Sequence, residues 1–209
     1  VATVGLTETY MFLLYSIGMG VSFAVTAVVA RRVGEGNKEQ AGKSAAQAIW
    51  IAFLVSLPFA LGGIFFAKDL LAIMGGDAWT INEGYRFTQW MLGGNIVIML
   101  LFMLNAVFRG AGDAAIAMRV LWIANAFNIV LCPMLINGWG PFPALGIQGA
   151  AIGTSIGRGI GVAIQLWVLF KGGKHIRATM AQLAWDAKAI WSIMKTSLGG
   201  VGQMIVAMT

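Results

Sequence analysis

The sequence predicts an all-α fold, a polytopic bundle of transmembrane helices. Of its 209 residues, 59% are hydrophobic and only 11% are charged, and the mean hydropathy is +0.81. Several apolar runs reach about 20 residues, the length of helix that crosses a hydrocarbon core about 30 Å thick. These runs lack the period-two alternation of barrel strands, and backbone polar groups in lipid must be satisfied within their own segment, so we expect helices.

Five apolar runs define the expected domain organisation. The predicted spans cover residues 5–30, 44–66, 87–107, 120–137 and 145–170, which together form an N-terminal transmembrane lobe over 1–170. Residues 171–196 are predicted to be a linker, with apolar side chains on one face of an amphipathic helix over 179–195. Residues 197–209 begin a further span and are too short to complete it. We therefore expect a fragment of a longer protein, cut at both ends.

Lysine and arginine are distributed unevenly between the connectors. Of the 14 basic residues, 11 lie in 31–43, 109–119 and 171–195, two lie in the intervening connectors, and Arg158 lies inside a span. Positive residues stay on the cytoplasmic side of a membrane, so these three loops are predicted to be cytoplasmic. The net charge of +6 follows from this topology and does not indicate a nucleic-acid partner.

Polar residues inside the spans are the candidate functional residues, because each is costly in lipid unless it is paired or hydrated. Glu8 is placed either to meet a cationic substrate or coupling ion, or to be a solvated carboxylate in the first turns of a helix. Asn125, Asn128 and Cys132 share one helix face. The two amides either line a substrate or ion pathway or tie neighbouring helices together.

The predicted span over 145–170 carries a polar stripe of Thr154, Arg158 and Gln165. Arg158 lies near mid-span and must face a partner or water. It either holds a carboxylate on a helix outside this chain or extends its side chain to the cytoplasmic interface. We assign the three residues to the same substrate or ion pathway.

Glycines and prolines within the spans indicate packing rather than chemistry. A four-residue repeat of glycines predicts a ridge against which another helix packs closely. It consists of Gly149, Gly153, Gly157 and Gly161. Pro58 and Pro133 each remove an intrahelical hydrogen bond and are predicted to kink their helices.

The sequence excludes several classes of protein. It contains no pairing of a nucleophile with a base, no phosphate-binding loop in a strand-to-helix context and no metal-ligand spacing. The single Cys132 and the single His175 rule out a disulfide and a His-rich cluster. We therefore predict no enzyme activity, no metal and no organic cofactor.

Four segments in order resemble the multidrug and toxic compound extrusion (MATE) family. They are "VTAVVARRVGEGNKEQA", "FRGAGD", "ANAFNIVLCPMLING" and "GPFPALGIQGAAIGTSIGR". The resemblance implies a twelve-helix antiporter made of two six-helix lobes, of which this chain supplies helices two to six, the linker and the start of helix seven. Family members carry asparagines that face the first-lobe cavity, and many have an aspartate where this chain has Cys132, which puts proton coupling at that position in doubt.

The resemblance also implies a function and its partners. We expect a secondary antiporter in the bacterial inner membrane, the plasma membrane, that exports organic, often cationic, compounds in exchange for H⁺ or Na⁺ by alternating access. Its partners would be a small organic substrate, the lipid bilayer and the remaining second lobe of the same chain. The alternatives are a flippase for a lipid-linked oligosaccharide, from a related family, and a non-transporting membrane assembly protein.

Overall fold

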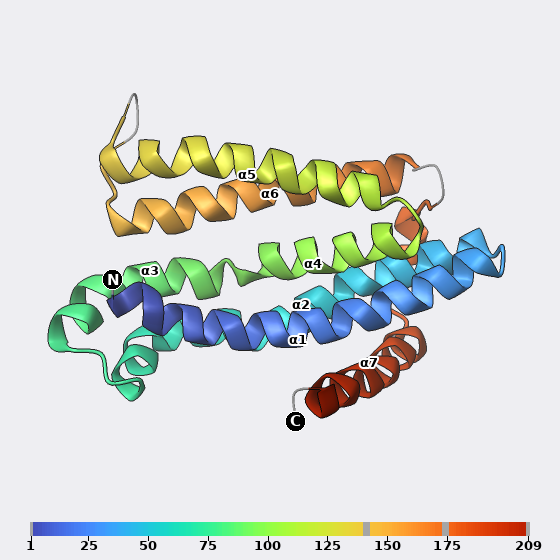
Figure 1. Ribbon diagram of the computed structural model, residues 1–209, viewed down its shortest axis with the longest axis horizontal. Helices are drawn as coiled ribbons and strands as arrows, with labels where there is room; N and C mark the ends of the chain where they lie inside the picture. The colour runs from blue at the N-terminus through green and yellow to red at the C-terminus, as the bar shows by residue number, and fades with distance from the viewer. Residues whose placement is uncertain (1, 140–142, 173–175, 208–209) are drawn as a thin grey trace.

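The computed structural model describes residues 2–139, 143–172 and 176–207, and these form a bundle of long helices (Figure 1). Lys174 and His175 lie outside the described residues. The elements are α1 (Ala2–Gly34), α2 (Lys38–Ile73), α3 (Ala78–Gly93), α4 (Asn95–Gly110), α5 (Ala114–Asn137), α6 (Ile147–Lys171), a 3₁₀ turn η1 (Met180–Leu183) and α7 (Ala187–Ala207). Five segments of the described chain are long and apolar enough to cross a membrane, which confirms the predicted fold class.

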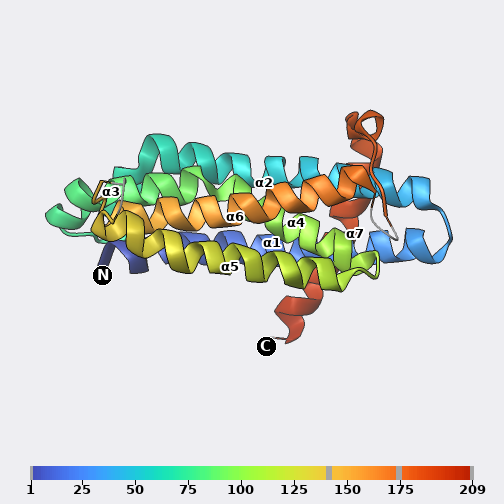
Figure 2. The ribbon, with the colours of Figure 1, turned by 90° about the horizontal axis from the view of Figure 1, so that it is seen from above.

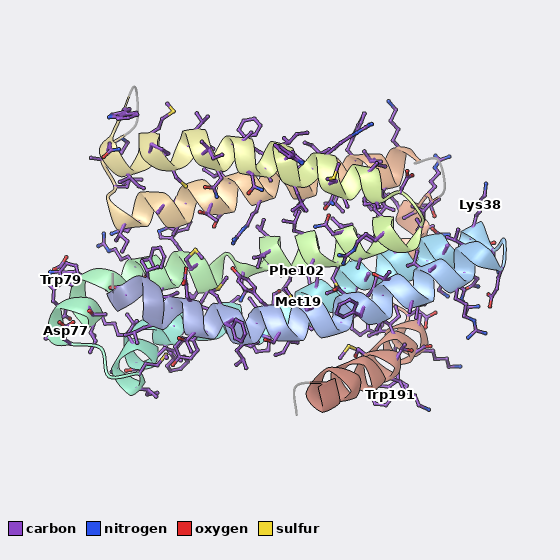
Figure 3. The ribbon with its side chains drawn as sticks, in the orientation of Figure 1. Met19, Lys38, Asp77, Trp79, Phe102 and Trp191 are labelled. Carbon is purple, nitrogen blue, oxygen red and sulfur yellow. The ribbon has the colours of Figure 1, made fainter. Side chains whose placement is uncertain are left out.

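The helices run between two ends of the bundle, which Figure 3 marks by Lys38 and Asp77. The α1–α2 and α4–α5 connectors and the last turn of α6 lie at the Lys38 end (Figure 1). The α2–α3 and α5–α6 connectors lie at the Asp77 end (Figure 1). The basic loops predicted from the sequence therefore gather at the Lys38 end.

The third predicted span is longer than expected and is divided in two. Residues 87–107 were predicted as one helix, whereas the structure has α3 and α4 joined at Gly94. Asp77 caps the start of α3 by accepting a hydrogen bond from the backbone N–H of Thr80 at 2.9 Å. The hydropathy pattern missed the first turns of α3 because Glu83 and Arg86 make that stretch polar, although a capped helix continues through them.

The position of the break in α2 also differs from the prediction. The non-helical backbone angles lie at Phe66 (φ −122°, ψ 21°), beyond Pro58. The glycine pair Gly62–Gly63 lies just before Phe66, and such pairs are a recognised cause of helix kinks. α5 continues through Pro133 to Asn137.

One buried core lies mainly between α1, α2 and α4 and also takes in side chains of α3, α5, α6 and α7, while α5 and α6 form a closely packed pair at its side (Figures 1 and 2). The largest side chains of that core that are fully buried include Leu14, Ile51, Met99, Leu104 and Phe108. α7 leaves the Lys38 end and packs obliquely across α1 (Figure 1). α6 also contacts α3 and α4 and so connects the α5–α6 pair to the rest of the bundle.

The glycine repeat of α6 lies against α5. A Cβ atom at Gly149 would lie 2.5 Å from the carbonyl oxygen of Leu135, and one at Gly157 would lie 2.8 Å from that of Ala124. A Cβ at Gly153 would meet the Cys132 sulfur at 2.9 Å. Real Cβ contacts are not this short, so the backbones of the two helices approach closely only because these positions are glycine.

Replacing Gly149 by alanine should destabilise the bundle. The added methyl group meets backbone atoms of α5, so we expect a loss of about 1–3 kcal/mol of unfolding free energy, as for other overpacked sites. Gly159→Ala is the matched control, because nothing lies within 4 Å of a Cβ at Gly159. Thermal unfolding of the detergent-purified protein measures both. Equal midpoints for the two variants would contradict the close packing of α5 and α6.

The linker was predicted to form one amphipathic helix over 179–195, and this is wrong. The structure has the turn η1 and then α7, which begins at Ala187 and runs on into the region predicted as a separate span. Between them, the Gln47 side chain of α2 donates hydrogen bonds to the carbonyls of Gln182 (3.2 Å) and Ala184 (2.8 Å). Trp50 Nε1 donates to the carbonyl of Leu183 at 2.7 Å. Because these carbonyls accept hydrogen bonds from α2, they do not serve as acceptors in one continuous helix.

Asp186 starts α7 and joins it to α2. Its carboxylate accepts hydrogen bonds from the backbone N–H groups of Lys188 and Ala189 and pairs with Lys43 Nζ at 2.6 Å. The bond from Lys43, followed by that from Ala189, lowers the pKa of Asp186 below its usual value. A lowered pKa in the folded state means that the carboxylate favours the docked linker above the ordinary aspartate pKa of about 4 and loses this effect as the pH falls through the folded value.

Replacing Gln47 by alanine should release the linker from α2. Gln47 is fully buried, and besides its two donated bonds it accepts one from the backbone N–H of Asp186. Loss of three such bonds, at about 0.5–1.5 kcal/mol each, should speed amide exchange of residues 182–186 by about tenfold or more. Gln40→Ala is the control, because the Gln40 side chain is exposed on the same helix. Unchanged exchange in Gln47→Ala would mean that other contacts hold the linker.

Candidate functional site

Two cavities lie where the α5–α6 pair meets the rest of the bundle. The first, of about 760 Å³, is lined by α1, α3 and the first half of α6, towards the Asp77 end. Its polar lining residues are Glu8, Thr9, Tyr15, Thr154 and Arg158.

The second cavity, of about 590 Å³, lies between α4 and α5 towards the Lys38 end. Its polar lining residues are Asn105, Arg109, Asn125, Asn128 and Arg158. The remaining walls of both cavities are mainly apolar, which is typical of small-molecule sites.

Arg158 lines both cavities. It is half-buried near the middle of α6, and in the described parts of the chain no carboxylate lies within 4 Å of its guanidinium. An arginine held in lipid at this depth costs from about 3 to more than 10 kcal/mol, depending on how the cost is measured. The two cavities give this charge a polar surface to face, and the structure places it at the junction between them.

A small polar cluster joins α5 to α6 beside this junction. Asn128 Nδ2 donates to Thr154 Oγ1 at 3.2 Å, and the Cys132 thiol donates to Asn128 Oδ1 at 3.2 Å. The cluster forms because Gly153 and Gly157 let α5 approach α6 at this level. Asn128 and Thr154 each line a cavity as well, so these residues both join the helices and line the chamber that the two cavities form together.

The other predicted residues fall into two groups. Glu8 is exposed and lines the first cavity, and Asn125 is exposed and lines the second. Gln165 lines neither cavity, because at its depth α4 closes against α6 and buries its side chain completely. Gln165 Nε2 donates to Asn105 Oδ1 at 2.7 Å. The stripe of Thr154, Arg158 and Gln165 is therefore divided between the chamber and a helix contact.

Two polar residues of the third span, Asn105 and Asn95, were not predicted from the sequence. Asn105 pairs with Gln165 and lines the second cavity, and Asn95 is buried at the junction of α3 and α4. Both could have been selected by the rule that selected Asn125, since each is an amide within an apolar run. Among the described residues, no three of His, Cys, Asp and Glu come together in a group able to hold a metal ion.

Comparison with known protein families shows which family the chain belongs to. The MatE family model matches residues 1–134, which is more than half of the sequence. The chain belongs to the MatE family. The predicted resemblance is thereby confirmed, and the chain is a multi-pass membrane protein.

The curated relatives are bacterial proteins named as a transporter or as multidrug resistance proteins. The chain is 29% identical over 153 residues to the "FAD transporter" of Shewanella oneidensis, which covers 73% of this chain and 34% of that protein. It is 28% identical over 175 residues to the "Probable multidrug resistance protein YoeA" of Bacillus subtilis, covering 84% of this chain and 38% of the relative. The chain thus spans about a third of the length of these relatives. Their names agree with the expectation that MatE proteins are transporters and not enzymes.

Solved structures share the fold. An inward-facing multidrug resistance MATE family transporter of the MOP superfamily superposes with a TM-score of 0.84 at 22% identity, over 96% of this chain and 45% of that one. A MOP superfamily transporter from Pyrococcus furiosus gives 0.83, also at 22% identity, over 96% and 44%. At this identity the likeness shows the fold alone, and the family is shown by the match to residues 1–134.

The contact between Asn105 and Gln165 should act as a helix tie. Gln165→Leu leaves the Asn105 amide buried without its partner, so we expect a loss of about 1–2 kcal/mol of unfolding free energy. The double variant with Asn105→Leu should lose less than the sum of the single variants. Thermal unfolding in detergent gives the three values. Additive losses would show that the two amides do not interact.

Proposed function

We propose that the complete protein is a secondary antiporter that exports small organic compounds in exchange for H⁺ or Na⁺ by alternating access. The observation that carries this proposal is the pair of cavities, one towards each end of the lobe, which have mainly apolar walls and share Arg158. A site reached in turn from the two sides of a membrane is what alternating access requires. The names of the relatives, multidrug resistance proteins and a transporter of FAD, support the same function.

We further propose that the Lys38 end faces the cytoplasm of a bacterium and that the remainder of the protein forms a second lobe across the chamber. The excess of lysine and arginine in the connectors at this end supports the orientation. The bacterial relatives support the plasma membrane as its location. The docked linker, followed by α7, would join the two lobes at this side.

The coupling ion should act at a carboxylate rather than at Cys132. The Cys132 thiol donates a hydrogen bond to Asn128 Oδ1 between α5 and α6, and Cys132 lines neither cavity. Of the residues that line the two cavities in the described chain, Glu8 is the one carboxylate. We therefore assign Glu8 a role in attracting the coupling cation at the Asp77 end of the chamber. The match to the MatE family favours this antiporter over an oligosaccharide flippase or an assembly protein.

Transport can be tested with the protein from the complete reading frame in proteoliposomes. Ethidium, a cation, and FMN, an anion, serve as fluorescent probes, with an imposed pH or Na⁺ gradient as the driving force. We expect at least one probe to move against the direction of one ion gradient and to stop when an ionophore collapses that gradient. Glu8→Gln should weaken the dependence on the gradient. Movement that is indifferent to both gradients, or absent for a panel of organic ions, would contradict antiport.

A further inference from the structure

The charges that line the two cavities are predominantly positive. Arg109 and Arg158 both line the second cavity, and no carboxylate of the described residues lines it. In the first cavity Arg158 is accompanied by Glu8, which is exposed near the start of α1. Arg158 is the charge common to both, so a ligand in either cavity meets a guanidinium.

We propose that the chamber binds an organic anion, and that Arg158 recognises its carboxylate or phosphate group. This rests on the proposed transport function and adds the class of substrate. A guanidinium presents a planar fork of N–H donors that matches two oxygens of either group. Because Arg158 is half-buried and the described chain gives it no acidic partner, an anion gains more from it than it would at a fully exposed arginine. An organic cation in the second cavity would meet two like charges and, among the residues that the structure describes, no opposite one.

Neighbouring donors can complete the recognition of the anion. Thr154 lies one helical turn before Arg158 on the same face of α6, and its hydroxyl lines the first cavity. The amides of Asn125 and Asn128 line the second cavity from α5. These groups are hydrogen-bond partners without charge, so they add direction to the binding without cancelling the arginine.

The apolar walls indicate that the anion carries an aromatic or otherwise planar body. Tyr15 and Phe12 of α1 line the first cavity, and Phe102 of α4 lines the second. Figure 3 shows Phe102 in the middle of α4, between the two ends of the bundle. Tyr15 and Phe102 are in edge contact with their ring centroids 5.8 Å apart, so the aromatic surface is continuous between the cavities. Each cavity lies within the range of about 300–1,000 Å³ that is usual for small ligands.

Riboflavin and FMN form a matched pair of probes for this proposal, because they share one fluorescent ring system and differ by a phosphate. With the purified complete protein in detergent, we expect FMN to bind roughly tenfold or more tightly than riboflavin, the usual effect of a charged hydrogen-bonded pair. Arg158→Gln should abolish this preference by weakening FMN binding and leaving riboflavin binding within about twofold. Arg158→Lys should retain part of it, because a lysine keeps the charge and loses the fork.

Arg119→Gln is the control variant, since Arg119 is exposed on α5 and lines neither cavity. It should bind both probes as the wild-type protein does. Equal affinity of the wild-type protein for FMN and riboflavin would overturn the proposal without any variant, so it stays testable if Arg158→Gln fails to fold. An equal loss of both probes in a folded Arg158→Gln protein would also overturn it, because it would show a structural role.

The binding assay needs no ion gradient, so it separates this inference from the proposed function. Arg158-dependent FMN binding without gradient-driven movement of any probe would uphold the anion site and contradict the antiporter. Gradient-driven movement of ethidium, with no preference for FMN over riboflavin, would uphold the antiporter and overturn the anion site.

Discussion

The close approach of α6 to α5 is the constraint on which the rest of the lobe depends. Four glycines at four-residue spacing leave one face of α6 without side chains, and the backbone of α5 packs against that face at Gly149, Gly153 and Gly157. Successive residues of a helix are turned by about 100°, so Arg158, which follows Gly157, points away from this interface. The same packing that joins the two helices thus directs the arginine into the chamber. Any residue with a side chain at Gly157 would move α5 and change where Arg158 points.

The other half of the lobe is held together differently. Helices α1 to α4 bury large apolar side chains against one another, and the second face of that core receives the linker. There α2 presents polar side-chain groups to the backbone of the linker. The Gln47 amide satisfies backbone groups on both sides of the break before α7, and Trp50 satisfies another. The start of α7 is therefore fixed to α2 by directed hydrogen bonds.

Features that depend on local periodicity were predictable from the sequence. The five spans follow from the length of the apolar runs, and the glycine ridge follows from its spacing. Features that depend on which helix lies opposite were not. Gln165 and Arg158 share a face of α6, but α4 places Asn105 opposite Gln165, whereas Arg158 faces a cavity. The prediction of one helix in the linker was wrong for a related reason. The apolar period of the linker fits a helix, but Gln47 and Trp50 of α2 donate hydrogen bonds to its backbone carbonyls.

The position of Arg158 at the junction of the cavities has a consequence for how an anion would cross the lobe. A ligand bound only in one cavity would have to lose its ionic partner before it entered the other, and this would place a bare charge in a mainly apolar passage. With one guanidinium lining both cavities, the carboxylate or phosphate can stay bonded while the aromatic body turns from the side of Tyr15 to that of Phe102. The anion then loses its hydration shell once, on entry, and keeps its ionic partner afterwards. Release towards the Asp77 end would bring the anion past Glu8, whose negative charge opposes its retention there and so favours its departure.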